Sequence, residues 1–224
     1  MKGLPMKLCI FDLDGTVLDT VSSIAHCGNR ALEKYGIAPI EVERYRYFAG
    51  DGAANLVRRM LVHRNRYTDD FYSAFFRDFS EIYAAEANCG ITVFKGLREV
   101  LDALKAAGYH LIIVTNKPDY AAEQVVEAHY KKGYFDCIIG QKPGSNLKPH
   151  PGEVLNVMQK MNVAPKDCVY VGDTDTDMKT GKNAGLYTIG VLWGFRDRNE
   201  LEANGADAIV ATPEELYKTI THCI

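Results

Sequence analysis

The sequence lacks several features that mark particular classes of protein. It has no Cys-x-x-Cys pair, and none of its six histidines lies near a cysteine at the short spacing of a zinc site. Positive charge is not in excess, because 26 Lys and Arg stand against 29 Asp and Glu for a net charge of -3. A nucleic-acid-binding protein usually has the opposite balance. With 47% hydrophobic residues among 224, the chain has enough apolar sequence for one sizeable core.

Long apolar runs are also missing. The N-terminal apolar stretch is interrupted by Asp12 too early for a signal peptide or a membrane span, and no later run reaches the length that a bilayer requires. We therefore expect a cytoplasmic protein with no membrane partner and no nucleic-acid partner.

The six cysteines are scattered along the chain, and three of them, Cys9, Cys137 and Cys168, lie inside apolar runs. Because no spacing suggests a metal site or a redox pair, we predict reduced and mostly buried thiols. The remaining three are Cys27, Cys89 and Cys223.

Short apolar runs rich in β-branched residues alternate with longer amphipathic segments. Six such runs cover residues 7–11, 110–115, 136–140, 168–172, 187–191 and 207–211. They are typical of parallel strands that are buried on both faces. Between the first two of these runs, residues 96–108 repeat leucine and valine on one helical stripe. This alternation predicts an α/β fold with a doubly wound, Rossmann-like parallel sheet.

The alternation fails between the first and second strands. About ninety residues pass there with helical patterns and no convincing strand, far more than a usual crossover connection requires. Candidate helices cover residues 20–35, 52–63 and 69–87. We therefore expect a helical insertion after the first strand.

Acidic and other polar residues directly follow three of the predicted strands. The segments are Asp12-Leu13-Asp14-Gly15-Thr16, Thr115-Asn116-Lys117, and Gly172 through Asp177. In an open parallel sheet the carboxyl ends of the strands border the ligand crevice, so these residues should meet there. Clustered carboxylates repel one another and favour a hard cation such as Mg²⁺. Helix capping alone could explain Asp173 or Thr174 singly, but not a second acidic cluster on another strand.

Four segments in order resemble the motifs of the haloacid dehalogenase superfamily of phosphohydrolases. They are residues 12–16, Thr115, Lys148 within Asn146–Pro151, and residues 172–177. The resemblance covers essentially the whole chain. It implies a catalytic core made of residues 1–17 and 89–224 and a helical cap domain made of residues 18–88.

The resemblance also assigns catalytic roles to the first acidic segment. Asp12 would attack phosphorus and form an aspartyl phosphate. Asp14 would act first as general acid and then as general base, since side chains two residues apart on an extended backbone share a face. Mg²⁺ would be held by Asp12, the backbone carbonyl of Asp14, and Asp173. Asp177 would order the surroundings of the metal or of Lys148 rather than bind the metal.

Phosphate contacts follow from the same resemblance. Lys148 would pair with the phosphoryl oxygens and with Asp12, assisted by the Thr115 hydroxyl and by backbone N–H groups near Gly15 and Asn116. The role of Lys117 stays open.

The expected cap carries a short basic stretch and a glycine-containing turn. Six arginines lie between residues 44 and 66 with Asp51 as the only acid, which favours anionic ligands. We single out Arg58 and Arg59 as candidates for substrate recognition, although a solvated basic helix face is the simpler reading of any one arginine. The turn at Gly50 leads into a helix whose free N–H groups could receive a carboxylate or phosphate.

Two segments narrow the expected activity. Residues 48–56 in the cap and residues 114–118 in the core are similar to phosphoglycolate phosphatases, so a small phosphorylated metabolite is the expected partner. Pyrophosphatases, sugar phosphatases, nucleotidases and β-phosphoglucomutase share the same core motifs and stay open. A phospho-accepting signalling domain is a further alternative, though it would need no closing cap. The chain is expected to be a monomer or a homodimer.

Overall fold

Six parallel strands form the central sheet of the computed structural model, which describes residues 6–224. The strands are β1 (Lys7–Phe11), β4 (Tyr109–Pro118), β5 (Cys137–Gln141), β6 (Cys168–Gly172), β7 (Tyr187–Val191) and β8 (Ala208–Val210). Their order is β5-β4-β1-β6-β7-β8, so the chain begins in the middle and builds outward in both directions. A crevice therefore opens beyond the carboxyl end of β1, between its two neighbours.

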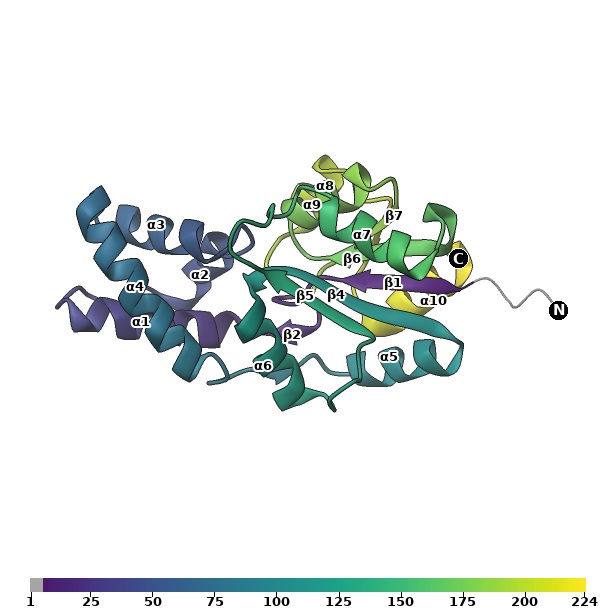
Figure 1. Cartoon of the computed structure of the whole chain (residues 1–224), viewed down its shortest axis with the longest axis horizontal. Coiled ribbons are helices and arrows are strands. Elements are labelled where there is room, and N and C mark those ends of the chain that lie inside the picture. The colour runs from purple at the N-terminus through teal and green to yellow at the C-terminus, as the bar shows by residue number, and fades with distance from the viewer. Residues whose placement is uncertain (1–5) are drawn as a thin grey trace.

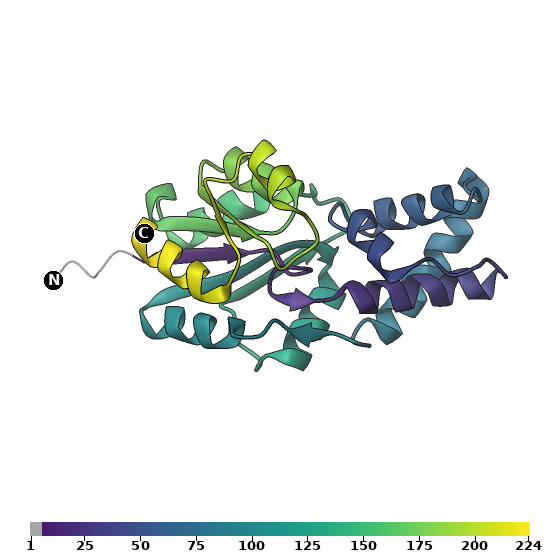
Figure 2. The same ribbon diagram turned by 180° about the vertical axis from the view of Figure 1, so that it is seen from behind.

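Helices cover both faces of the sheet, which confirms the doubly wound α/β class (Figures 1 and 2). One face packs against α7 (Gly152–Met161) and α8 (Asp175–Asn183), and the other against α5 (Leu97–Ala106), α6 (Asp119–His129) and α10 (Pro213–Cys223). Residues of β1 alternate between the two cores, with Leu8 and Ile10 in one and Cys9 and Phe11 in the other. Because both faces of the central strands are buried, most of their positions are apolar. A 3-10 turn (Pro165–Asp167) precedes β6, and α9 (Arg198–Ala203) precedes β8.

Four helices stand together beyond one end of the sheet (Figure 1, left). They are α1 (Val21–Lys34), α2 (Val42–Phe48), α3 (Ala53–His63) and α4 (Asp69–Glu86), and they pack on one another. Three of them match predicted segments, whereas α2 was not expected, because its seven residues bury only Tyr45 and so carry no apolar stripe. No helix within residues 6–224 is long and apolar enough to cross a membrane.

A short ribbon joins the helical insertion to the sheet domain. Strand β2 (Leu18–Asp19) pairs antiparallel with β3 (Thr92–Val93). The expectation of no strand between the first two core strands is therefore wrong. Two residues per strand are too few to produce a recognisable alternation of apolar and polar positions.

The cysteines differ in part from the expectation. Cys9, Cys27 and Cys168 are buried, but Cys89 and Cys137 are exposed. Cys137 lies in an apolar run, yet it begins β5 at the edge of the sheet, where one strand neighbour is missing and less of each residue is covered.

Helices α1 and α2 approach closely at Gly28. A Cβ atom at this position would lie 2.6 Å from both Cε1 and the hydroxyl oxygen of Tyr45, whose side chain is fully buried. The hydroxyl of Tyr45 also donates a hydrogen bond to Asn29, at 2.9 Å. The ring therefore has little freedom to move away from a larger residue.

We predict that Gly28→Ala destabilises the protein, although alanine is the better helix former by about 1 kcal/mol. Overpacking against a buried ring costs about 1–3 kcal/mol, so a net loss is expected. Urea unfolding of this variant should be compared with that of Ser22→Ala, an exposed position of the same helix. An equal or greater stability of Gly28→Ala would show that the helices can separate without cost.

Candidate active site

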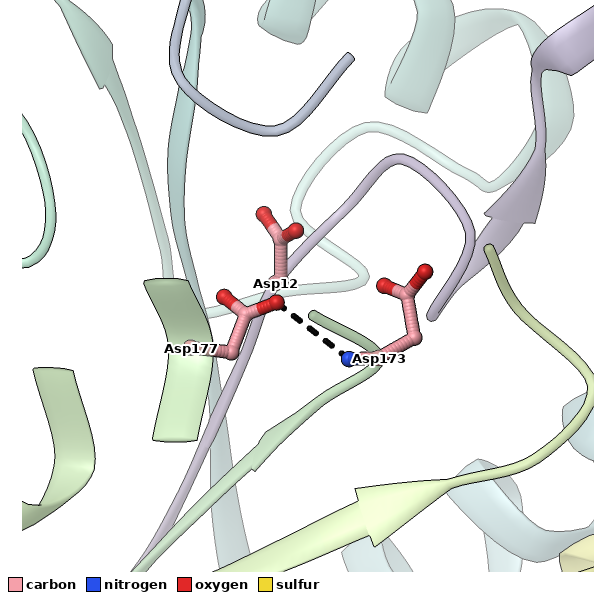
Figure 3. A group of neighbouring side chains, drawn as sticks. All are labelled: Asp12, Asp173 and Asp177. Atoms are coloured by element: carbon pink, nitrogen blue, oxygen red, sulfur yellow. Dashed lines mark hydrogen bonds between the residues drawn. The ribbon is translucent and has the colours of Figure 1, made fainter. Parts of the chain in front are cut away.

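Three carboxylates meet at the carboxyl end of the sheet (Figure 3). Asp12 follows β1, Asp173 follows the neighbouring β6, and Asp177 lies in the first turn of α8. One oxygen of each lies within 4.8 Å of the others, and all three residues are buried. The two acidic segments of the sequence thus form one cluster, which helix capping alone does not explain.

Both oxygens of Asp177 are occupied by hydrogen-bond donors. Its Oδ1 accepts from Nζ of Lys148 at 2.7 Å and from the hydroxyl of Tyr170 at 3.2 Å. Its Oδ2 accepts from the backbone N–H groups of Asp173 and Thr174 and from the Thr174 hydroxyl, at 3.2, 3.0 and 2.7 Å. Asp177 is therefore suited to holding Lys148 and the start of α8 rather than a metal.

The carboxylate of Asp173 is held between two glycines. Its Oδ1 accepts from the Thr16 hydroxyl and its Oδ2 from the backbone N–H of Phe195, both at 2.7 Å. A Cβ on Gly15, which has a φ of 86°, would lie 2.3 Å from Asp173 Oδ2, and a Cβ on Gly194 would lie 2.3 Å from Asp173 Cβ. The sequence did not reveal Gly194 and Phe195, because the loop after β7 lies outside the four motifs and Phe195 contributes only its backbone N–H.

The carboxylate of Asp12 is less well satisfied. Its Oδ1 lies 2.8 Å from Nζ of Lys148 as an ion pair, but the pair lacks hydrogen-bond geometry and this buried oxygen has no hydrogen-bond partner among residues 6–224. Burial and the charge of Asp177 raise the pKa of Asp12 to about 7, against the opposing effect of Lys148. Burial and Asp177 likewise raise the pKa of Asp173 well above its usual value.

The three buried carboxylates share one lysine, Lys148, which pairs with Asp12 and Asp177, so negative charge is left unbalanced. A hard divalent cation prefers carboxylate oxygens as ligands, and here they are buried and one of them accepts no hydrogen bond. The residues present therefore fit a Mg²⁺ ion.

Asn116 links Lys148 to the helical insertion. Its Oδ1 accepts from the backbone N–H of Lys148 at 2.8 Å, and its Nδ2 donates to the carbonyls of Lys148 and Gly50, at 3.1 and 3.0 Å. The sequence suggested a backbone contact with phosphate for Asn116 and did not reveal this role of its side chain. Burial disfavours the charge of Lys148, but Asp12 and Asp177 outweigh it and raise the pKa of Lys148 well above its usual value.

A cavity lies between the acidic cluster and the helical insertion, with about 440 Å³ of empty space that is partly open to solvent. Core residues on its wall are Asp12, Asp14, Thr115, Asn116, Lys117 and Pro118, and insertion residues are Ile24, Ala49, Gly50, Gly52, Ala53, Leu56, Phe79 and Tyr83. Five of the expected site residues, Asp12, Asp14, Thr115, Asn116 and Gly50, therefore line one space. Lys117 is the only Lys or Arg on this wall among the residues that the structure describes.

The two candidate arginines do not line the cavity. The guanidinium of Arg58 lies over the ring of Tyr67, 5.0 Å from its centroid. Arg59 donates to the carbonyl of Phe48 at 2.9 Å and forms an ion pair with Asp51. Both side chains contact other residues of the insertion, so this geometry gives no support to their expected contact with substrate.

The loop that carries Gly50 is fastened to the core. Asp51 accepts from the hydroxyl of Thr176 at 2.7 Å. Arg196, in the loop after β7, donates to the carbonyls of Arg46 and Ala49. These contacts hold the insertion closed over the cavity, and Arg196 was not singled out in the sequence.

Comparison with known proteins identifies the family. Residues 9–191 match the haloacid dehalogenase-like hydrolase family. A phosphoglycolate phosphatase from Chromobacterium violaceum is 30% identical over 214 residues, which cover 95% of each chain. One from Vibrio parahaemolyticus is 29% identical over 224 residues, which cover 98% of each chain. The chain belongs to the haloacid dehalogenase-like hydrolase family, as its four motifs predict.

Solved structures agree with this assignment. The crystal structure of a protein from Lactobacillus delbrueckii subsp. bulgaricus superposes on this chain with a TM-score of 0.90 at 30% identity. The match covers 97% of this chain and 99% of that protein. That of a predicted phosphoglycolate phosphatase from Haemophilus somnus gives a TM-score of 0.88 at 27% identity, with the same coverage. The named relatives and the shared fold identify this chain as a phosphatase.

We predict that Mg²⁺ stabilises the protein much more at pH 8 than at pH 5. The pKa of Asp12 rises from 3.8 to about 7 in the folded protein. The folded state therefore binds the extra proton between these pH values, and the metal-free protein loses stability as pH rises from about 4 to about 7. Mg²⁺ binds only the ionised carboxylates, so it should stabilise the folded protein at pH values where Asp12 has lost its proton.

Thermal melts with Mg²⁺ and with EDTA at the two pH values measure this effect. The difference in Tm should reach several degrees at pH 8 and nearly vanish at pH 5. Asp173→Asn should abolish the difference at both. A Mg²⁺ effect independent of pH would contradict binding at these carboxylates.

Proposed function

We propose that this phosphatase hydrolyses phosphoglycolate, with Mg²⁺ as cofactor and a phosphorylated Asp12 as intermediate. The observation that carries the proposal is the buried Asp12 carboxylate, which is paired with Lys148 but has one oxygen that accepts no hydrogen bond, on the wall of a small covered cavity. Residues 18–88 would act as the cap domain and the rest of the chain as the catalytic core. The free cysteines support a reducing, cytoplasmic setting.

The metal would be held by Asp12, Asp173 and the backbone carbonyl of Asp14. When bound, Mg²⁺ screens the repulsion between a carboxylate nucleophile and a phosphate dianion. Asp177 would hold Lys148 against Asp12, as its 2.7 Å hydrogen bond to Nζ of Lys148 allows.

The reaction would proceed in two displacements at phosphorus. In the first, a carboxylate oxygen of Asp12 bonds to phosphorus while the bond to the leaving oxygen breaks, and Asp14 gives that oxygen a proton. In the second, water attacks phosphorus and gives a proton to Asp14, and the phosphorus–oxygen bond to Asp12 breaks. Inorganic phosphate leaves, and both carboxyl groups return to their initial states.

The phosphoryl group would be held by groups that do not react. Lys148 and the Thr115 hydroxyl offer a positive charge and a hydrogen-bond donor beside Asp12. Closure of the cap over the cavity would exclude bulk water while the phosphoryl group is transferred.

The residues that line the cavity favour a small leaving group. Its wall on the cap side is largely apolar, with Ile24, Leu56 and Phe79, and offers few polar partners for a sugar or a nucleoside. The N–H groups where α3 begins, at Gly52 and Ala53, are placed to receive a carboxylate. These features, together with the names of the relatives, support phosphoglycolate.

We expect phosphate release from phosphoglycolate to exceed that from other phosphomonoesters by orders of magnitude in kcat/KM. The panel should contain pyrophosphate, hexose phosphates, nucleoside monophosphates and an aryl phosphate, each with Mg²⁺ and with EDTA. Broad weak Mg²⁺-dependent activity would refute the substrate and keep the mechanism. A lasting phosphoryl-Asp without release would instead indicate a signalling domain.

Asp12→Asn should abolish turnover, because an amide cannot replace the carboxylate nucleophile. The matched control is Asp175→Asn, an acid of the 172–177 segment that pairs with Lys179 on α8 and does not line the cavity. The control should keep full activity. Residual turnover of Asp12→Asn near that of the control would remove Asp12 as nucleophile.

A further inference from the structure

A buried lysine connects the proposed acid/base residue to the cap. Nζ of Lys117, at the end of β4, lies 2.9 Å from Oδ1 of Asp14. The same Nζ contacts the hydroxyl oxygen of Tyr83, on cap helix α4, and lies 4.9 Å from the centroid of that ring. All three residues line the catalytic cavity. They come from three separate segments, the loop after β1, strand β4 and the cap.

The burial of Lys117 distinguishes this contact from a surface ion pair. Its side chain is 1% exposed, whereas that of Asp14 is 17% exposed. A lysine is rarely buried without a partner, and Asp14 and Tyr83 supply the partners here. The backbone N–H of Lys117 also donates to the Thr115 hydroxyl at 3.2 Å, which fixes the strand end. The ammonium group is therefore held in one place.

We propose that Lys117 is a positioning residue, which acts through Asp14 and depends on Tyr83 of the closed cap. This inference rests on the proposed function. Lys117 holds Oδ1 of Asp14, so that Oδ2 is the oxygen left to meet the leaving group. Proton transfer needs such a fixed geometry, because a shift of about 1 Å can cost on the order of 10²-fold in rate.

Tyr83 makes this arrangement depend on cap closure. Its hydroxyl comes from α4, whereas Lys117 and Asp14 belong to the core. When the cap opens, the hydroxyl moves away with α4 and Lys117 loses one of its two polar partners. The proton donor is then aligned only while the cavity is covered and water is excluded.

The test compares leaving groups that need a proton with one that does not. Ethyl phosphate and phosphoglycolate release alkoxides, which require protonation, whereas p-nitrophenyl phosphate releases a stable phenolate. Single-turnover release of the leaving group isolates the first displacement. Lys117→Met should slow this step about 10²-fold for both alkyl phosphates. For p-nitrophenyl phosphate the change should be no more than a few fold.

Asp14→Asn and the double variant test whether Lys117 acts through Asp14. Asp14→Asn should show the same selectivity between leaving groups. The double variant should be no slower than Asp14→Asn alone, since residues acting as one unit are not additive. Additive losses would overturn the proposal.

Tyr83→Phe tests the cap contribution and does not depend on the folding of Lys117→Met. It keeps the ring over Lys117 and removes only the hydroxyl. We expect a smaller loss in the same direction, in kcat rather than KM. Tyr35→Phe is the matched control, because its hydroxyl bonds to Asp78 within the cap, at 2.6 Å and away from the cavity. Equal behaviour of the two tyrosine variants would overturn the role of Tyr83.

The outcomes separate this inference from the proposed function. A loss for phosphoglycolate alone, with ethyl phosphate unchanged, would show that Lys117 binds the substrate carboxylate and would overturn positioning. Equal losses of rate for all three substrates would also overturn the positioning role of Lys117. If the wild type hydrolyses ethyl phosphate but does not favour phosphoglycolate, the substrate proposal fails while the leaving-group comparison still decides the role of Lys117.

Discussion

The repulsion among three buried carboxylates is the constraint on which the site depends. Asp12, Asp173 and Asp177 offer oxygens within 4.8 Å of one another, and burial deprives them of solvent. Such a cluster persists only if the surrounding structure fixes every member and its negative charge is compensated by bound protons or by cations. The sheet meets the first requirement, since β1 and β6 are neighbouring parallel strands in the centre of two packed cores. Lys148 meets part of the second, and a divalent cation would supply the rest.

Two buried lysines divide the acids between the proposed steps of the reaction. Lys148 contacts Asp12 and Asp177, where the phosphoryl group would be held. Lys117 contacts only Asp14 among the acids of residues 6–224, on the side of the cavity where the leaving group would depart. Separate lysines allow each carboxylate to be oriented independently. Asp12 and Asp14, only two residues apart, can therefore face different parts of one substrate, as their proposed roles of nucleophile and proton donor require.

The sequence was most informative where the position of a site residue is set by a strand that it directly follows. All six strands of the central sheet were predicted, because each contains a short apolar run, and the acids that follow two of them meet at one sheet edge. Features that depend on packing between distant segments could not be predicted. Gly194 packs against Asp173, Arg196 bonds to Ala49 of the insertion, and the side chain of Asn116 bonds to Gly50. Each of these contacts joins residues that no periodic pattern relates. Charge composition also does not say which way a side chain points: Arg58 and Arg59 contact Tyr67 and Asp51 of the insertion, and their contact with substrate stays a prediction.

The β2–β3 ribbon has a consequence for how the chain folds. The two central strands β1 and β4 pair Lys7 with Tyr109, 102 positions apart, and closing so long a loop carries a large entropic cost. Consecutive helices of the insertion pack on one another, its first and last helices α1 and α4 pack together, and the ribbon brings its two ends together. If the insertion assembles before the central strands meet, it shortens the effective loop between them, which favours faster formation of the sheet. The insertion that covers the cavity would then also speed the pairing of the two central strands of the sheet.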